Sequence, residues 1–287
     1  MLSYFYINHL LKPMTEMTPP QINNQKLQIQ TWWFTALLIT VNVGLFGWQI
    51  VSGVNITDPA PVDAIAWGAD FTPLTFMGQP ERLFTSMFFH FGLIHLMLNM
   101  WALYIFGNVA EQLFGRLYYI GMYVLAGLMG SVLSSYLTIR DGYELLQHFD
   151  RLAGLQSSLF PHISAGASGA VMGLGAALTV ISLFPPLPQQ RFWLDKKSLL
   201  MVMAINLVFG FTVAGINNAA HIGGMMMGAL LAAIWFLGEK IQKPALIQIG
   251  ALIIGTVLLA AFYFYCTELS TGLDPLWNEI LRQNQLS

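Results

Sequence analysis

The sequence has few charged residues and a single cysteine. Only 9% of its 287 residues are charged, whereas a soluble domain carries about 25%. The formal net charge of -2 offers no basic surface for nucleic acid, so we expect no nucleic-acid partner. The lone Cys266 excludes an intramolecular disulfide and a four-cysteine zinc site. The sequence therefore predicts neither a bound metal nor a cofactor.

Long apolar stretches are the main feature of the sequence. Hydrophobic residues make up 56% of the chain and the mean hydropathy is +0.61, which is typical of an integral membrane protein. No alternating ten-residue pattern supports a barrel, and helices satisfy their own backbone in lipid. We therefore predict an all-α polytopic membrane protein with seven spans. These are Trp32–Val51, Thr85–Phe106, Leu117–Leu137, Ser168 to the Pro185-Pro186 break, Ser198–Val213, Ala219–Leu237 and Ala245–Cys266.

The spans divide the chain into four parts. Residues 1–29 are predicted to be an N-terminal cytoplasmic extension, because no cleavable signal precedes the first span. Residues 30–238 form a core of six helices, and residues 239–266 form an inner loop and a seventh helix. Residues 267–287 are expected to be a tail on the outer side. The polar stretch 140–161 is expected to be a solvated outer loop.

Basic residues orient the predicted bundle. With the N-terminus inside, eight of the twelve Lys and Arg residues fall in inner segments and four in outer ones, which matches the positive-inside rule. The inner eight are Lys12, Lys26, Arg116, Arg191, Lys196, Lys197, Lys240 and Lys243, and the outer four are Arg82, Arg140, Arg151 and Arg282.

A serine and a histidine open two of the spans. Ser168 begins the fourth and His221 lies near the start of the sixth, so both are predicted at similar depth near the outer surface. Strongly polar residues in a membrane segment are costly and usually mark a functional site. A serine beside a histidine is also a nucleophile beside a base.

Small residues explain how these two helices approach each other. The fourth span contains Gly169 and Gly173, and the sixth contains Gly224 and Gly228. Glycines four residues apart permit close packing of helices in lipid. Such packing brings two short side chains within hydrogen-bond reach.

His95 and Asn99 form a second polar pair, in the second span. They are four residues apart, so they share one face of a helix. At matching depth, the Asn99 amide can donate to an oxyanion that develops at Ser168, together with His95 and the Ser168 backbone N–H.

In combination these motifs resemble the rhomboid family of intramembrane serine proteases. The resemblance covers about residues 80 to 238, and the order of its motifs is more specific than any one of them. They are His95-x-x-x-Asn99, Gly166-Ala-Ser168-Gly169, Ala220-His221-x-x-Gly224-x-x-x-Gly228 and Gly107-x-x-x-Glu111-Gln112-x-x-Gly115. The resemblance implies a rhomboid-like six-helix bundle, to which this chain adds a C-terminal transmembrane helix.

The resemblance also implies roles for single residues. Ser168 would be the nucleophile and His221 its general base, as a dyad without a carboxylate. Asn99 and His95 would line the oxyanion hole, and Gly166 would let the chain bend close to it. Among the supporting residues, His90 would be a structural histidine, Glu111 would tie the loop between the second and third spans, and Arg82 would anchor the first outer loop.

Two positions depart from the family pattern. The Trp-Arg pair of the family's first loop reads Glu81-Arg82 here, which keeps the arginine. Family members commonly have an aromatic residue four positions after the nucleophile, where this chain has Met172. The thioether can still pack against an imidazole, so we expect a working dyad with a somewhat different orientation.

The sequence therefore predicts a serine endopeptidase that cleaves transmembrane helices of other membrane proteins. An inactive rhomboid-like protein that binds such helices is the alternative, although it would be expected to lack Ser168 or His221. A channel would place ionisable groups through the whole depth of the membrane, and here they gather near one face. The expected location is a bacterial inner membrane, with the N-terminus cytoplasmic and the site open to the outer side. The oligomeric state is not indicated.

Overall fold

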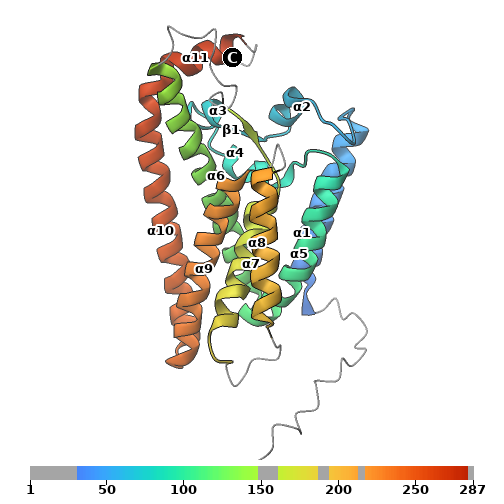
Figure 1. Ribbon diagram of the computed structural model, residues 1–287, viewed down its shortest axis with the longest axis vertical. Coiled ribbons are helices and arrows are strands. Elements are labelled where there is room, and N and C mark those ends of the chain that lie inside the picture. The colour runs from blue at the N-terminus through green and yellow to red at the C-terminus, as the bar shows by residue number, and fades with distance from the viewer. Residues whose placement is uncertain (1–30, 148–160, 187–193, 213–216, 284–287) are drawn as a thin grey trace, which may run out of the picture. The chain divides into compact units, whose positions relative to one another are not determined.

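The computed structural model describes residues 31–147, 161–186, 194–212 and 217–283, and these residues are mostly helical. The predicted N-terminal extension lies outside them. Seven long helices correspond in order to the seven predicted spans (Figure 1). They are α1 (Trp33–Val51), α5 (Leu93–Phe114), α6 (Arg116–Gln147), α7 (Ser168–Leu183), α8 (Lys196–Thr212), α9 (Asn218–Lys240) and α10 (Pro244–Ser270).

Short elements lie at one end of the long helices, which we call the α2–α4 end (Figure 1). They fill the connection from α1 to α5, precede α7 and follow α10. They are α2 (Pro61–Ala66), β1 (Asp70–Phe71), α3 (Thr72–Phe76), α4 (Arg82–Thr85), the 3-10 helices η3 (Ser86–Phe88) and η6 (Thr271–Leu273), β2 (Ile163–Ser164) and α11 (Asp274–Gln283).

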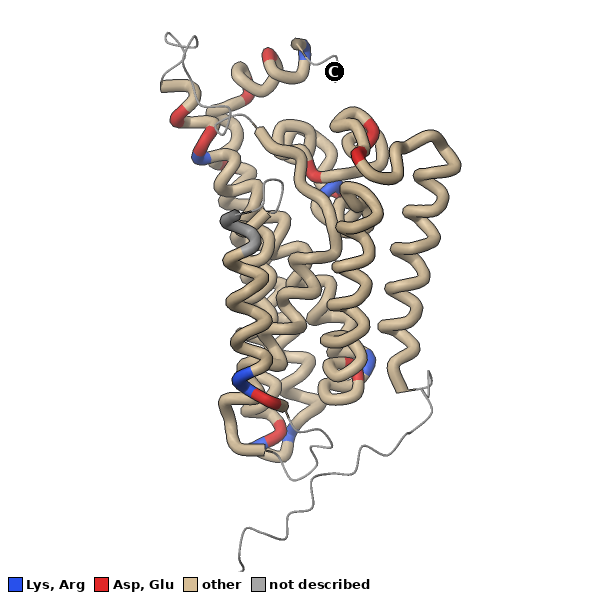
Figure 2. Tube along the Cα trace, turned by 45° about the vertical axis from the view of Figure 1, so that its right-hand side comes forward, with Lys and Arg blue, Asp and Glu red and all other residues tan. Residues whose placement is uncertain are grey.

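Five of the helical segments are long and apolar enough to cross a membrane, namely α1, α5, α6, α9 and the segment that begins with α10. Figure 2 shows acidic and basic residues at the two ends of the bundle and none in the broad band between them. Charged side chains avoid hydrocarbon because their desolvation is costly. The prediction of an all-α polytopic membrane protein is confirmed.

The shortest of the seven long helices, α7, consists mostly of buried residues. It is 16 residues long, and every residue from 169 to 179 is buried. It packs against α5, α6, α8 and α9. A helix surrounded in this way does not need to match the thickness of the bilayer, because its neighbours shield it from lipid.

Glycines set the contact between α7 and α9. A methyl group added at Gly224 would overlap the carbonyl oxygen of Gly169, and one added at Gly228 would overlap that of Gly173. The two backbones therefore touch directly over two turns, as small residues permit in membrane helices. This contact fixes the spacing between the helix that begins at Ser168 and the helix that carries His221.

Three predicted boundaries were wrong. The second span begins at Leu93, not Thr85, because Thr85 ends α4 and residues 86–92 form η3 and a turn that ends at Gly92, whose φ is 88°. An apolar run that folds into short buried pieces looks the same in sequence as a span. Residues 140–147 belong to α6, and the rest of the predicted outer loop, residues 148–160, lies outside the described residues. The predicted tail contains the end of α10 and the helix α11.

The connection between α1 and α5, residues 52–92, is tied to the rest of the bundle at several points. Its β1 pairs with β2 in antiparallel register, with Asp70 opposite Ser164. The Arg82 guanidinium donates from Nη1 to the carbonyl oxygens of Ile65 (2.8 Å) and Ala69 (2.9 Å). Apolar residues of α3 and α4 share a buried cluster with α11, whose Trp277 is completely buried.

A buried carboxylate lies at the centre of this connection. Asp70 accepts hydrogen bonds from Thr75 Oγ1 (2.6 Å) and from Ser135 Oγ of α6 (3.0 Å). Burial raises the pKa of Asp70 to about 6, although the two hydrogen bonds and the nearby Arg82 act in the opposite direction. The native state therefore binds a proton at Asp70 more tightly than the unfolded chain does.

We predict that this group makes the fold less stable as the pH rises. The stabilisation that protonated Asp70 provides is fully present below about pH 4 and is lost as the pH rises through about 6. A pKa raised by about two units corresponds to about 3 kcal/mol at most. The Asp70→Asn side chain stays neutral, and the Ser135 hydroxyl can rotate to accept from its amide. Thermal midpoints measured from about pH 4 to pH 7.5 should fall less in this variant than in the wild type. Equal pH dependences would contradict the prediction.

Candidate active site

A cavity of about 140 Å³ lies among the helices near the α2–α4 end. It has room for several water molecules. Helices α5, α6, α7 and α8, the β2 segment and the start of α9 contribute to its wall. The lining contains seven of the twelve residues predicted for the site. These seven are His95, Asn99, Gly166, Ser168, Gly169, Met172 and His221.

Ser168 is the first residue of α7 and is partly exposed to the cavity. Its hydroxyl makes no hydrogen bond with any described residue. The first amides of a helix have no intrahelical acceptor, so the Ser168 backbone N–H is free to donate. The N-terminus of α7 also carries the positive end of the helix dipole. This position suits a nucleophile whose reaction generates a negative charge.

His221 lies in the first turn of α9 and is buried, with 6% of its surface exposed. Its Nδ1 has no hydrogen-bond partner among the described residues, and none of the residues that line the cavity is acidic. The Ser168 hydroxyl and the His221 ring face the same cavity, without a hydrogen bond between them in the described chain. Hydrogen bonds between catalytic groups are often long before substrate binds.

The hydrogen bonds of His95 define its neutral tautomer. Its Nδ1 accepts from the backbone N–H of Phe91 at 3.2 Å, so in the neutral ring the proton is on Nε2. That nitrogen lies only 3.0 Å from the place where a Cβ on Gly166 would be. Gly166 has a φ of 121°, which disfavours a side chain in any case. The glycine thus leaves the His95 N–H directed at the segment that precedes Ser168.

Asn99 follows one turn after His95 on α5. Its Nδ2 donates to the His95 carbonyl oxygen at 3.0 Å, and this uses one of the two amide protons. The second proton makes no hydrogen bond with a described residue, and Asn99 lines the cavity. Three donors, from Asn99, His95 and the Ser168 backbone, therefore belong to one cavity.

His90 is buried next to this group but does not line the cavity. Its Nε2 accepts from the Ala167 backbone N–H at 3.5 Å, and its ring centroid lies 5.2 Å from that of His95. It contacts the turn before Ser168 and not the reacting region itself. Met172 lines the cavity one turn after Ser168 and is 4% exposed.

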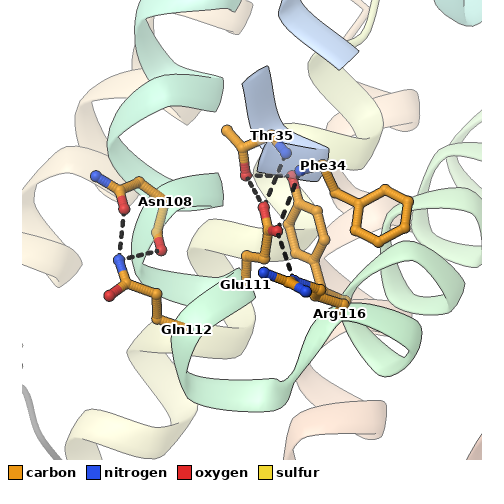
Figure 3. Close-up of polar contacts among 7 residues, drawn as sticks. Phe34, Thr35, Asn108, Glu111, Gln112 and Arg116 are labelled. Carbon is orange, nitrogen blue, oxygen red and sulfur yellow. Dashed lines mark hydrogen bonds and ion pairs between the residues drawn. The ribbon is translucent and has the colours of Figure 1, made fainter. Parts of the chain in front are cut away.

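Four further predicted residues lie away from the cavity. Gly224 and Gly228 form the contact with α7, and Arg82 lies in the connection before α5. Glu111 is at the opposite end of α5, where it caps α1 from outside that helix (Figure 3). Its carboxylate accepts from the backbone N–H of Phe34 (3.1 Å) and Thr35 (2.8 Å), and Arg116 lies 3.9 Å away.

We expect Glu111→Gln to destabilise the bundle by about 2 kcal/mol, because a buried backbone N–H loses a charged acceptor. The N-cap of α1 provides no side-chain hydrogen bond of its own. Thermal unfolding in detergent micelles measures the change, with the exposed Glu144→Gln as the matched control. Because Glu111 is far from the cavity, activity per folded molecule should stay unchanged. Equal midpoints for the two variants would contradict the capping role.

The sequence analysis missed several polar residues of the cavity. Ser86, Ser164, Asn206 and Asn217 also line it. Asn206 stands out in sequence as an amide inside an apolar stretch, which is a recognisable signal. Asn217 lies just before a helix, where an asparagine is usual as a cap, and nothing in its sequence position distinguishes it.

The chain resembles known proteins of one family. The family model described as Rhomboid domain matches residues 77–239. The chain is 29% identical over 240 residues to rhomboid protease AarA of Providencia stuartii, with 80% of this chain and 82% of AarA covered. It is 29% identical over 230 residues to rhomboid protease GluP of Bacillus subtilis, with 79% of this chain and 38% of GluP covered.

A plant relative matches about half of the chain. RHOMBOID-like protein 6, mitochondrial, of Arabidopsis thaliana is 36% identical over 158 residues, which are 53% of this chain and 43% of that protein. The matched family model covers more than half of the chain and includes every helix from α5 to α9. The chain belongs to the rhomboid family.

Proposed function

We propose that this chain is an intramembrane serine endopeptidase that hydrolyses peptide bonds of transmembrane helices, with Ser168 as nucleophile and His221 as general base. Membership of the rhomboid family and similarity to two rhomboid proteases support intramembrane protease activity. The observation that carries the residue assignment is the cavity, which brings a serine, a histidine and three hydrogen-bond donors together.

The reaction needs only groups present in this cavity. His221 accepts the proton of Ser168 Oγ as that oxygen attacks the substrate carbonyl carbon. The tetrahedral intermediate places its negative oxygen near the Ser168 N–H, the His95 Nε2–H and the Asn99 amide, and loss of one such donor typically costs about 10²–10³ in kcat. His221 then gives the proton to the leaving amine as the peptide C–N bond breaks. Water attacks the acyl-enzyme ester by the same route, with His221 again as base.

Water and substrate must both reach the cavity. The cavity lies near one end of the bundle, so water can enter without crossing the apolar band (Figure 2). A substrate helix must expose a carbonyl that its own hydrogen bonds would otherwise hold. We therefore expect cleavage near the end of the substrate helix, at residues that weaken helical structure.

The orientation in the membrane is part of the proposal. In the described chain, Arg116, Lys196, Lys197, Lys240 and Lys243 belong to the end opposite the cavity, and Arg82, Arg140 and Arg282 belong to the α2–α4 end. The positive-inside rule then places the cavity on the outer side and the N-terminus in the cytoplasm. A bacterial inner membrane is the proposed location.

The alternative is a rhomboid-like protein that binds transmembrane helices without cutting them. The plant relative is named RHOMBOID-like and not a protease, which leaves this alternative open. Purified chain in liposomes with a reporter that contains one transmembrane helix separates the two. A protease yields two fragments whose masses identify a cut near the end of the helix. If reporters with several different helix sequences all stay bound and uncut, the chain is a binding protein and not a protease.

A further inference from the structure

One asparagine joins three elements of the site. The Asn217 amide donates from Nδ2 to Ser134 Oγ of α6 at 2.5 Å and to Ser164 Oγ of β2 at 2.9 Å. Its Oδ1 accepts from the backbone N–H of Ala220, in the first turn of α9, at 3.0 Å. All of the hydrogen-bonding groups of this side chain are therefore used, each toward a different element.

The same residue holds the turn that carries His221. The His221 backbone N–H donates to the Asn217 carbonyl oxygen at 3.2 Å. The consecutive amides of Ala220 and His221 thus donate to the side chain and to the backbone of Asn217, respectively. The direction in which the His221 ring enters the cavity depends on how this first turn is held.

The other end of the connection leads to the nucleophile. Ser164 is four residues before Ser168, and the segment between them passes Gly166, whose N–H donates to the Ser86 carbonyl oxygen at 2.8 Å. The bond from Asn217 to Ser164 therefore links the strand that leads into α7 to the start of α9. On the α6 side, Gly130 lies against the Ala220 carbonyl oxygen, which keeps α6 in contact with the same turn.

We propose that Asn217 is a positioning residue that sets the alignment of His221 with Ser168. The inference rests on the proposed function, since it concerns the geometry of that dyad. Asn217 acts through the backbone of α9 and through Ser164 and is not assigned a direct part in the chemistry. Asn217 is four residues before His221, so its side-chain bonds fix the first turn of α9 to both β2 and α6.

Replacement of Asn217 by alanine removes all three side-chain bonds, and we expect kcat to fall about 10–100-fold, because small misplacements of catalytic groups cost that much. KM should change less than about twofold, since binding of the substrate helix is not altered. Asn217→Asp keeps an acceptor for the Ala220 N–H, and the hydroxyls of Ser134 and Ser164 can rotate to donate to it. This variant should recover most of kcat.

The test compares these variants by reporter cleavage in liposomes, with the reactive enzyme counted by labelling the active serine to completion with a fluorophosphonate. Asn108→Ala is the matched control, because it removes an asparagine whose side chain, among the described residues, bonds only Gln112 at the other end of α5. Ser164→Ala serves as a milder variant that leaves the cap on α9 intact, with an expected loss in kcat of about three- to tenfold.

A loss in kcat per labelled serine that the aspartate restores supports the positioning role. Wild-type kcat per labelled serine in Asn217→Ala, with only the thermal midpoint lowered, would overturn it while the proposed function stands. Failure of the folded Asn217→Asp variant to recover would also overturn it. A wild-type chain that neither labels nor cleaves would contradict the proposed function, and the positioning role with it.

Discussion

Replacement of Ser168 by alanine is expected to lower the turnover of a transmembrane reporter by at least about 10³-fold, because the attacking oxygen is lost and only binding and the oxyanion donors remain. His221→Ala should cause a loss of similar size, since the serine hydroxyl is then no longer deprotonated as it attacks. The double variant should be no worse than the single ones, because residues that act as a unit are not additive.

The comparison is clean because Ser168 contributes little to the fold. Its hydroxyl bonds no described residue, so alanine leaves no partner unsatisfied. Ser182→Ala is the matched control, since Ser182 is near the other end of α7 and, within the part of the chain that the structure describes, donates only to the Thr179 carbonyl oxygen at 2.6 Å. Of these two serine variants, only Ser168→Ala should show a lower turnover in single-turnover and steady-state assays. Equal activity of the two variants would show that another residue is the nucleophile.

Replacement of Gly224 by alanine is expected to have the second largest effect, on both activity and stability. The added methyl group would overlap the carbonyl oxygen of Gly169, which is backbone and cannot rotate away. Helices α7 and α9 must then separate, and overpacking of this kind typically costs about 1–3 kcal/mol. Gly224 is one turn from His221, and Gly169 is next to Ser168, so the dyad separates as well. A displacement of about 1 Å costs about 10²-fold in kcat.

Two other glycines make this prediction specific. Gly250→Ala in α10 adds the same methyl group where nothing lies within 4 Å, and it should change neither the midpoint nor the turnover. Gly228→Ala meets the carbonyl oxygen of Gly173, two turns from His221, so it should lower stability as much as Gly224→Ala but turnover less. Thermal unfolding and reporter cleavage measure both quantities. If Gly224→Ala behaves like Gly250→Ala, close packing of α7 on α9 does not hold the site.

The helices and the grouping of the site residues were largely predictable from sequence. Long apolar helices are needed to cross a bilayer, so the apolar runs of the sequence located seven of them. Ser168 and His221 were predicted at one depth because each begins a helix, and the glycine spacing indicated that those helices touch. His95 and Asn99 follow from a four-residue spacing on α5. In the structure all four residues line one cavity.

What could not be predicted depends on contacts between distant segments. The strand pair of β1 and β2 is two residues long on each side, too short to produce an alternating pattern. Residues 86–92 are mostly apolar and are packed within the α2–α4 end, where Phe89 has none of its surface exposed. Glu111 caps a helix 76 residues earlier in the chain, and the three partners of Asn217 come from three elements. The spacing of residues along the sequence does not predict such contacts.

The most direct test of the central claim is to identify the residue that an active-site fluorophosphonate modifies in the wild-type protein in liposomes. The account predicts a single modified peptide, with the label on Ser168, and loss of labelling in His221→Ala because the serine is then not activated. Labelling of a different serine, or labelling of Ser168 that is unchanged in His221→Ala, would contradict the assignment of a Ser168–His221 dyad.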